Sequence, residues 1–397
     1  MPRRPPQPQR RRVAVTGLGA VSCCGTGKDA FFAGLFGPQP AGERRVFNFD
    51  PLDWFDAKAA RRVDRFTQFS VAAAQLALDD AGSVGFDPAR AGVYFATGIG
   101  GLETLEQQIE VMLEKGARRI SPFLVPMMMP NRGAAEISMR FGMRGPCETI
   151  TTACAAGTHA IGAAYRAVAD GRCDLVVTGG GEAAMTRVGI GAFTNMTAIS
   201  PSGRSMPFDR RRDGFVIGEG GGALVLETLE RARARGAHIY GEVLGASSNA
   251  DAHHVTAPSP GGTGAAVCIE LALEDAGLEA SEIAHINAHG TSTQLNDLAE
   301  AEAIHKVFGG VGPPVTSIKG ITGHSLGAAG ALEAVAAMMT IEQGRIPPTA
   351  GYEEADPEVD LDIVAGEARA LAPGAVISNS FGFGGHNGCL VIGPVED

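Results

Sequence analysis

The sequence predicts an α/β protein whose sheet is covered by helices on both faces. Two observations carry this prediction. Strand-like runs that are apolar nearly throughout alternate with helix-like segments, and a second series of the same kind follows the first. With 397 residues, of which 45% are hydrophobic, the chain is long enough for one large layered domain or for two subdomains.

The elements follow in order along the chain. The first series has strand-like runs at 11–18, 91–98, 147–153 and 173–181, and helix-like segments at 69–82 and 160–171. The second series has strands at 222–230 and 239–249, a helix near 263–276, a strand at 283–289, a helix at 295–308, a strand at 314–320, a helix at 326–344, and strands at 375–381 and 388–394. The chain therefore looks built twice.

The dividing line between the two halves is expected near residue 240, after the charged segment ERARARGAH. The halves are then 12–240 and 241–397, and because no Gly/Ser or Pro linker separates them, we expect them to share one core. The glycines that end VTGGG at 177–181 and SFGFGG at 380–385 are a weak sign of internal duplication. The start, MPRRPPQPQRRR, cannot bury apolar surface, so residues 1–11 are expected to form a disordered basic tail.

Composition excludes several classes of function. A net charge of -11 argues against nucleic acid as the main partner, because phosphate binding needs a positive surface. No apolar run approaches the roughly 18 to 20 residues that a membrane span needs, so no membrane partner is expected. The seven cysteines are an odd number without CxxC spacing, which predicts free thiols in a reducing cytoplasm.

Cys154 is the first candidate for a reactive residue. It lies in TTACAAGTHAIG, between a strand and an Ala/Gly-rich helix sequence, so its sulfur is expected at a strand-to-helix turn. A helix N-terminus favours a thiolate and offers free N–H groups to an oxyanion. Alone, however, the segment fits a small buried structural cysteine better.

Two histidines change that balance. His289 ends the strand in INAHGTSTQLND, and His324 lies in SIKGITGHSLGAAG between a strand and an Ala-rich helix. Each alone is more often structural, but both stand at the carboxyl ends of strands, where open α/β sheets bind ligands. Together with Cys154 they have the composition of a Cys/His/His nucleophilic site.

Several other polar groups have an ordinary alternative. Lys319, Glu300 and Glu333 fit surface charges when each is taken alone, and the loop SNSFGFGGHN at 378–387, with Phe383, fits a simple Gly-rich turn. The DAHH sequence at 251–254 lacks a third ligand at metal spacing, so no metal site is predicted.

Seven blocks taken together resemble the condensing enzymes of the thiolase superfamily, the β-ketoacyl synthases. In chain order they are ITTACAAGTHAIG, GGGEAAMT, SMPFDRRRDGFVIGEGGG, SSNADAHHVTAPSP, INAHGTSTQLNDLAE, SIKGITGHSLGAAGALE and SNSFGFGGHNG. The resemblance implies a thiolase-like fold of five layers, α-β-α-β-α, with two halves related by a pseudo-twofold axis. It also implies a homodimer and no cofactor.

The reaction that the resemblance implies is a two-stage Claisen condensation. Cys154 takes an acyl chain from acyl carrier protein as a thioester, and malonyl-carrier protein then loses carbon dioxide and attacks it. His289 and His324 are the expected donors to the enolate oxygen, and the backbone N–H groups of Cys154 and Phe383 form the oxyanion hole. Phe383 also gates the acyl pocket, and the supporting groups are Lys319, Glu300 and Glu333.

The resemblance extends to the two binding surfaces. The expected acyl-pocket residues are Ile99, Leu124, Met129 and Phe193. A basic rim for the acidic carrier protein is assigned to Arg61, Arg62, Arg65, Arg118 and Arg119, although a solvated charged face explains these residues equally well. Two positions depart from the family pattern: His386 replaces the commoner threonine and Gln294 the commoner proline.

The sequence leaves competing functions open. The same site serves fatty acid elongation, a type II polyketide or polyene pathway, and malonyl decarboxylation or acyl cyclisation. A non-catalytic chain-length partner usually lacks the cysteine, which is present here as Cys154. A degradative thiolase needs a second cysteine near the C-terminal loop, where Cys389 lies inside the expected last strand.

Overall fold

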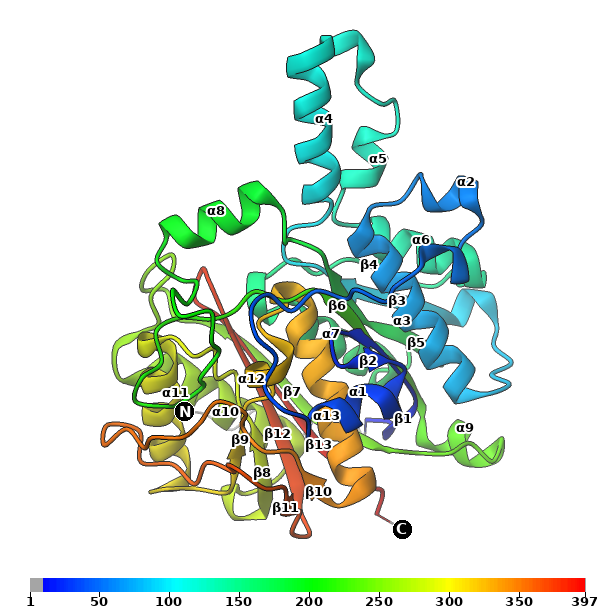
Figure 1. Ribbon diagram of the computed structural model, residues 1–397. Coiled ribbons are helices and arrows are strands. Elements are labelled where there is room, and N and C mark those ends of the chain that lie inside the picture. Colours follow the sequence, from blue (N-terminus) through cyan, green and yellow to red (C-terminus); the bar gives the residue numbers. More distant parts are fainter. Residues whose placement is uncertain (1–9, 397) are drawn as a thin grey trace.

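The computed structural model describes residues 10–396 (Figure 1). Its main sheet has eleven strands, ten of which form one continuous path. In spatial order they are β4 (Cys147–Glu148), β3 (Ala91–Ala96), β5 (Leu175–Glu182), β6 (Gly220–Thr228), β1 (Val13–Ser22), β7 (Gly241–Ala250), β13 (His386–Gly393), β12 (Ala375–Gly382), β8 (Ile283–Asn287) and β9 (Val315–Thr316). Strand β2 (Gly25–Thr26) pairs with β1, and β10 (Arg345–Ile346) pairs with β11 (Arg369–Ala370) in a separate ribbon.

The sheet consists of two halves with the same strand order. From edge to centre the first half runs β4-β3-β5-β6-β1 and the second runs β9-β8-β12-β13-β7. In both halves the two outer pairs are parallel and the two inner pairs antiparallel. The halves meet where Val13–Val15 of β1 pair with Gly241–Val243 of β7. This repeat is the internal duplication that the sequence indicated only weakly.

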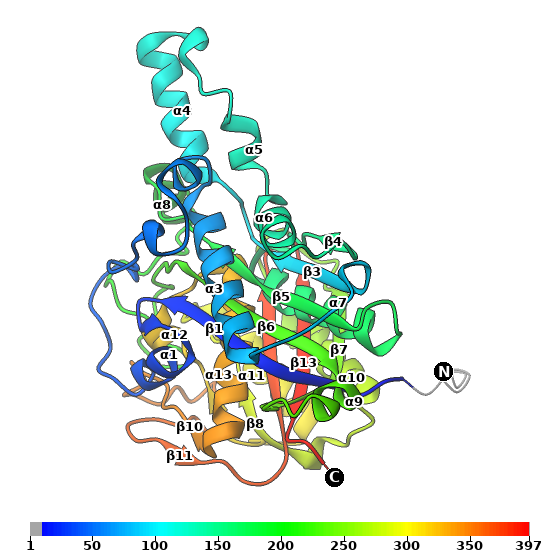
Figure 2. The same cartoon turned by 90° about the vertical axis from the view of Figure 1, so that its right-hand side faces the viewer.

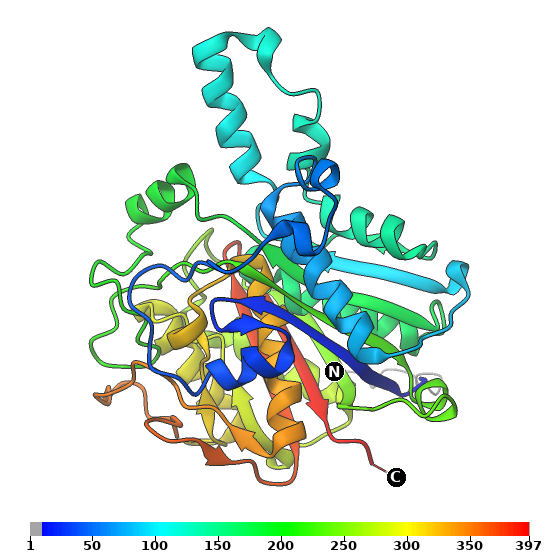
Figure 3. The same ribbon diagram turned by 45° about the vertical axis from the view of Figure 1, so that its right-hand side comes forward.

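Helices make the remaining layers. Helices α7 (Ala156–Ala169) and α13 (Ala329–Gln343) contact each other and strands of both halves, so they form the middle layer. Helices α3 (Arg65–Ala81) and α6 (Arg132–Phe141) cover the outer face of the first half, and α10 (Thr263–Ala276) with α11 (Gln294–Phe308) cover the second. Figure 3 gives a view of α13, in orange, beside the red strands. The predicted five-layered thiolase-like fold is confirmed.

A projection stands out from this body (Figures 1 and 2). It comprises α4 (Leu102–Lys115), the short turn η3 (Ala117–Arg119) and α5 (Leu124–Met128). Leu113 at 77% exposure and Val125 at 61% leave apolar surface open on it. The other helices are short: α1 (Lys28–Gly34), α2 (Ala57–Ala60), α8 (Arg187–Asn195), α9 (Leu229–Ala234) and α12 (Lys319–Thr322).

The structure shortens two predicted strands. The run 147–153 pairs only at Cys147–Glu148, because the chain then leaves the sheet edge to form the turn that carries Cys154. The run 314–320 pairs only at Val315–Thr316, because Lys319 already begins α12.

The predicted N-terminal tail ends earlier than residue 11. Arg10 pairs with Asp275 at 2.7 Å, and the Arg11 N–H donates to the Ala169 carbonyl, so both residues belong to the folded part. Residues 1–9 lie outside the described residues. Across positions 10–396, no helix is both long and apolar enough to span a bilayer.

Candidate active site

Cys154 lies in a tight turn between β4 and α7, as its sequence context predicts. The turn is the 3-10 segment η4 (Ala153–Ala155), and Ala153 adopts a left-handed φ of 51°. The thiol is buried against Ala184 and Leu326. The backbone of Gly382, at the end of β12, closes over the turn so tightly that a Cβ there would lie 3.1 Å from the Cys154 nitrogen. Small residues therefore let two backbones meet at the sulfur.

The resting sulfur of Cys154 is a thiol. Burial raises the pKa of Cys154 to about 11, although the Lys319 charge and the Phe383 N–H both act to lower it. Burial therefore opposes the effect of the helix N-terminus, which was expected to favour a thiolate. A base in contact with the sulfur has to take the proton when the thiol reacts.

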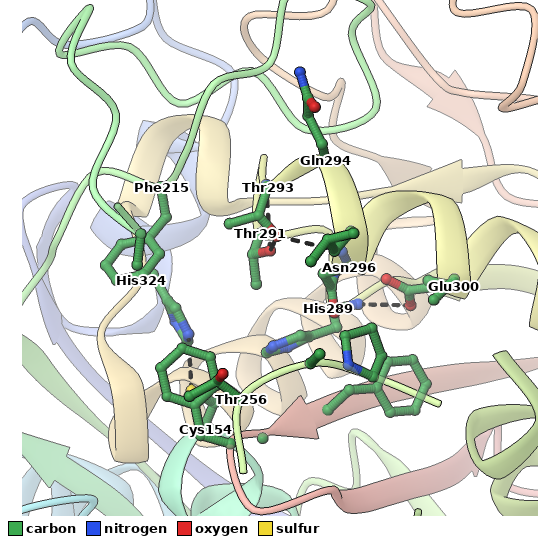
Figure 4. A pocket seen from close by; sticks show the side chains of 18 of the residues that line it. Cys154, Phe215, Thr256, His289, Thr291, Thr293, Gln294, Asn296, Glu300 and His324 are labelled. Atoms are coloured by element: carbon green, nitrogen blue, oxygen red, sulfur yellow. Dashed lines mark hydrogen bonds between the residues drawn. The ribbon is translucent and has the colours of Figure 1, made fainter. Parts of the chain in front are cut away.

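His324 is that contact. Its Nε2 lies 3.0 Å from Cys154 Sγ, and its ring stands edge-on to the ring of His289 with centroids 5.4 Å apart (Figure 4). Both rings are fully buried, and burial, followed by the Lys319 charge, holds the pKa of each histidine well below its usual value. Both histidines are therefore neutral, and each carries one ring N–H.

Lys319 fixes the orientation of His289. Its Nζ donates to the His289 carbonyl at 2.6 Å, lies 3.3 Å from His289 Nδ1, and pairs with Glu333. An ammonium offers only protons, so Nδ1 accepts and the ring proton is assigned to Nε2. His289 then presents an N–H on the side away from Lys319.

Glu300 holds the turn on which His289 sits. Its carboxylate accepts from the backbone N–H groups of His289 and Gly290, each at 2.8 Å, and from the Asn379 amide at 3.3 Å. Burial raises the pKa of Glu300 to about 7. These contacts hold the turn behind the His289 ring, and Glu300 also borders the cavity that contains Cys154.

The loop after β12 brings a second N–H to Cys154. The backbone N–H of Phe383 donates toward the sulfur, and Gly384 and Gly385 follow with left-handed φ values of 87° and 71°. His386 is the next residue, and its ring packs over Gly384 and lies 6.5 Å from the ring of His159. His386, which stands where the family pattern more often has threonine, thus lies beside the loop that carries Phe383.

These groups line one cavity of about 700 Å³. Cys154, His289, His324 and Phe383 all border it, together with Phe193. The other three residues expected in the acyl pocket do not border it in the single chain. Ile99 lies in the loop after β3, and Leu124 and Met129 lie at α5, where Ile99 and Met129 are about 40% exposed.

Comparisons with known proteins agree with this architecture. Residues 39–232 match the family model "Beta-ketoacyl synthase, N-terminal domain" and residues 240–353 match "Beta-ketoacyl synthase, C-terminal domain". The chain is 44% identical to a protein from Synechocystis named "3-oxoacyl-[acyl-carrier-protein] synthase 2", over 96% of this chain and 97% of that one. A Staphylococcus aureus protein of the same name is 42% identical over 98% and 99%.

The chain belongs to the β-ketoacyl synthase family. Solved structures give the same result. The ishigamide ketosynthase/chain length factor aligns with a TM-score of 0.93 at 37% identity, over 98% of this chain and 100% of that one. A β-ketoacyl synthase from Burkholderia phymatum gives 0.89 at 35% identity, over 97% and 100%.

The basic residues assigned to this synthase's rim fall into two groups. Arg61, Arg62, Arg118 and Arg119 are exposed, and Arg62 stacks on the Phe123 ring at 4.5 Å, beside α5. Arg65 differs, because its guanidinium bonds Glu219 at 2.7 Å and the Val46 carbonyl at 2.9 Å. Arg65 is thus half-buried and held by Glu219 and Val46, which leaves it poorly placed to meet a partner.

Cys154, His289 and His324 also have the residue types of a metal site. The ligand atoms of Cys154, His289 and His324 lie within 4.8 Å of one another. The Lys319 ammonium, 3.3 Å from His289 Nδ1, places a positive charge behind one ligand and opposes a cation there. The arrangement suits a nucleophile with two hydrogen-bond donors better than a metal centre.

Two aromatic residues that contact the histidines were not predicted from the sequence. The Phe215 ring stands edge-on to His324 at 5.1 Å, and the Phe381 ring stands edge-on to His289 at 5.9 Å. Both residues lie inside family blocks, RRRDGFVIGEGGG and SNSFGFGG. Their position next to glycine-rich strand ends was the available signal, but periodicity says nothing about which ring meets a histidine.

Proposed function

We propose that the protein condenses an acyl thioester held on Cys154 with malonyl-acyl carrier protein, lengthening the acyl chain by two carbons. One observation carries the proposal: a buried thiol and two neutral histidines border a single cavity, with His324 Nε2 3.0 Å from the sulfur. The enzyme is accordingly an acyltransferase of the β-ketoacyl-acyl carrier protein synthase class.

In the first stage the acyl group moves to Cys154. His324 Nε2 accepts the thiol proton as the sulfur attacks the acyl carbon of the incoming thioester. The bond from that carbon to the carrier sulfur breaks, and the proton passes to the departing carrier thiol. The histidine ends the stage neutral, as its burial requires.

In the second stage malonyl-carrier protein loses carbon dioxide. The electron pair of the broken carbon–carbon bond moves onto the thioester, which becomes an enolate with charge on its oxygen. The Nε2–H of His289, fixed by Lys319 behind the ring, points to the cavity. The first stage leaves the ring proton of His324 on Nδ1, so His324 completes the donor pair after that proton has moved to Nε2 by exchange with solvent, once the sulfur is acylated.

The enolate carbon then attacks the acyl carbon on Cys154. Negative charge collects on the acyl oxygen, for which the N–H groups of Cys154 and Phe383 are the proposed donors. Collapse of the intermediate breaks the bond to sulfur, and the sulfur regains a proton from solvent. The β-ketoacyl product leaves on the carrier protein.

We propose acyl carrier protein as the partner and a homodimer as the assembly. A related solved structure is titled as an acyl-carrier protein in complex with its ketosynthase. Strand β4 is an exposed sheet edge, and the projection beside it exposes Met129 and Val125, which favours burial against a second copy. The exposed arginines Arg61, Arg62, Arg118 and Arg119 suit an acidic carrier. Seven free cysteines favour a cytoplasmic location.

A second candidate function has an observation of its own. The ishigamide ketosynthase/chain length factor matches 98% of this chain at a TM-score of 0.93, which favours the same chemistry in a polyketide or polyene pathway, with a related subunit in place of the second copy. Activity of the purified chain alone separates the two, since a pathway-specific heterodimer needs its partner.

The test is product formation by the purified chain. Incubation with acyl- and malonyl-carrier proteins should give a β-ketoacyl-carrier protein two carbons longer than the acyl donor, detected by mass spectrometry. Cys154→Ala should give none. Cys154→Gln, whose amide resembles an acylated sulfur, should release carbon dioxide from malonyl-carrier protein without condensation. Equal product from Cys154→Ala would refute the proposal.

A further inference from the structure

The turn that carries Cys154 has a counterpart in the other half of the molecule. Before α13 lies the 3-10 segment η7 (Leu326–Ala328), just as η4 precedes α7. Leu326 has a left-handed φ of 45°, close to the 51° of Ala153 in the same place. Because the strand orders of the halves repeat, Gly327 occupies in the second turn the place of Cys154 in the first.

A strand end faces each of these turns. Gly382 is the last residue of β12, and its backbone lies against the Cys154 N–H, where the oxyanion site is proposed. Its counterpart Glu182 is the last residue of β5, a strand of the same eight-residue length. The Glu182 carboxyl group accepts from the Gly327 N–H at 3.1 Å, so a buried acidic side chain, whose pKa burial raises to about 7, occupies the second copy of the oxyanion site.

The Glu182 carboxylate also binds a third segment. It is fully buried, and it accepts from the Gly98 N–H at 2.6 Å and from the Thr97 hydroxyl at 3.2 Å. The two glycine backbones touch, because a Cβ on Gly327 would lie 2.0 Å from the Gly98 nitrogen. Glu182 thus ties the loop after β3 to the turn before α13 at a point that admits no side chain.

The three segments joined by Glu182 carry the apolar wall around the thiol. Ala184 lies two residues after Glu182, Leu102 follows the loop after β3, and Leu326 precedes Gly327. All three pack with Cys154 in one cluster. An acyl chain on the sulfur begins at this wall, and Ile99 lies in the tied loop.

We infer that Glu182 is a positioning residue that occupies the duplicated oxyanion site and so fixes the wall at which the acyl chain on Cys154 begins. The inference rests on the proposed function, since it concerns the acylated form of Cys154. Glu182 does not touch the reacting atoms. It acts through Gly98 and Gly327, whose backbones set where Leu102 and Leu326 stand.

The experiment compares acyl transfer to Cys154 across donors of short, medium and long chain. Glu182→Ala removes the hydrogen-bond acceptor of Gly98, Gly327 and Thr97. The kcat/KM for acyl transfer should therefore fall about ten-fold to a hundred-fold, a size that a displacement near 1 Å can produce. The order in which the acyl donors rank by kcat/KM should also change. Glu182→Gln keeps one oxygen for Gly98 and Gly327 and an amide for the Thr97 hydroxyl, so it should restore most of the rate.

Two further variants separate a change in the order of acyl donors from a general loss of folded protein. Gly98→Ala places a Cβ 2.7 Å from the Glu182 carboxylate and should change the order of donors in the same way without altering charge. Glu227→Gln is the matched control, because Glu227 is equally buried but bonds Thr16 and Arg235, outside the cluster around Cys154, and its order of donors should equal that of wild type.

The outcomes separate the two claims. If wild type gains no acyl mass with any donor, the proposed function fails. If wild type is acylated and Gly98→Ala, together with Glu182→Ala where it folds, keeps the wild-type order of acyl donors, the inference alone is overturned. A lowered rate with an unchanged order of acyl donors also counts against the inference, because loss of folded protein lowers the rate with every acyl donor by the same factor. A shared change of order in Glu182→Ala and Gly98→Ala supports it.

Discussion

His289 and His324 are buried neutral rings, and the proposed second stage needs both as donors to the enolate oxygen. Replacing both with alanine removes two hydrogen bonds made to developing charge, so we expect malonyl decarboxylation to fall at least about a hundred-fold. Carbon dioxide release from malonyl-carrier protein measures it. His238→Ala, a change at a half-exposed ring paired with Glu342, is the control. Decarboxylation at the wild-type rate in the double variant would remove the assigned role.

A third buried histidine, His285, should make the stability of the fold sensitive to acid. His285 on β8 has no hydrogen-bond partner at either ring nitrogen within residues 10–396, and burial lowers the pKa of His285 to about 3. The unfolded chain binds a proton near pH 6.5, whereas the folded chain does not. The free energy of unfolding therefore falls as the pH falls from 6.5 toward 3, by about 2 kcal/mol at pH 5.

The substitution His285→Leu should remove this loss of unfolding free energy at acid pH. Urea titrations at pH 7 and pH 5 measure the free energy of unfolding of each protein, and the variant should gain about 2 kcal/mol relative to wild type between the two pH values. His253→Gln, at an exposed ring, serves as control. An equal pH dependence of variant and wild type would show that the ring is hydrated or partnered in solution.

Among the elements, the middle layer depends on close contact between two helix starts. A Cβ on Gly330 of α13 would lie 2.2 Å from Thr158 Oγ1 on α7. Gly330→Ala should therefore push the helices apart and lower the free energy of unfolding by about 1 to 3 kcal/mol, measured by urea denaturation. Gly191→Ala on α8 meets nothing within 4 Å and should leave the free energy of unfolding unchanged or raise it by up to about 1 kcal/mol, because alanine favours a helix. Equal stability of both variants would contradict the packing described here.

The sequence predicted elements well where local pattern decides them. Helix α10 has the predicted bounds, Thr263–Ala276, because its apolar spacing and the following Gly277 define it locally. The α4–α5 projection was not predicted, since its apolar side chains face no interior that would impose a clear pattern. The predicted length of β4 was too long, because residues Thr149–Thr152 have side chains typical of strands but leave the sheet to form the turn that carries Cys154.

At the scale of the whole molecule, the internal duplication was the feature that was hardest to predict from the sequence. The repeated orders β4-β3-β5-β6-β1 and β9-β8-β12-β13-β7 are long-range pairings that no local pattern encodes. Cys154, His289 and His324 could be selected as candidates from the sequence because they lie at strand ends in recognisable blocks. Their protonation could not be predicted, since the pKa of Cys154 is set by burial, which depends on Leu326 and Ala184 from distant segments.

The proposed homodimer gives a prediction about the projection. Val125→Asp places a charge on its exposed apolar surface and should weaken self-association, measured by light scattering after size-exclusion chromatography over a dilution series. Val267→Asp, at an exposed apolar position on α10, is the control and should leave the mass of the assembly unchanged. A wild-type mass of one chain at all concentrations would contradict the homodimer.

The most direct test of the central claim is the intact mass of the protein after incubation with acyl-carrier protein. The account predicts that wild type gains the mass of one acyl group, that Cys154→Ala gains none, and that the added mass disappears when malonyl-carrier protein is supplied. No added mass on wild type, or the same added mass on Cys154→Ala, would contradict it.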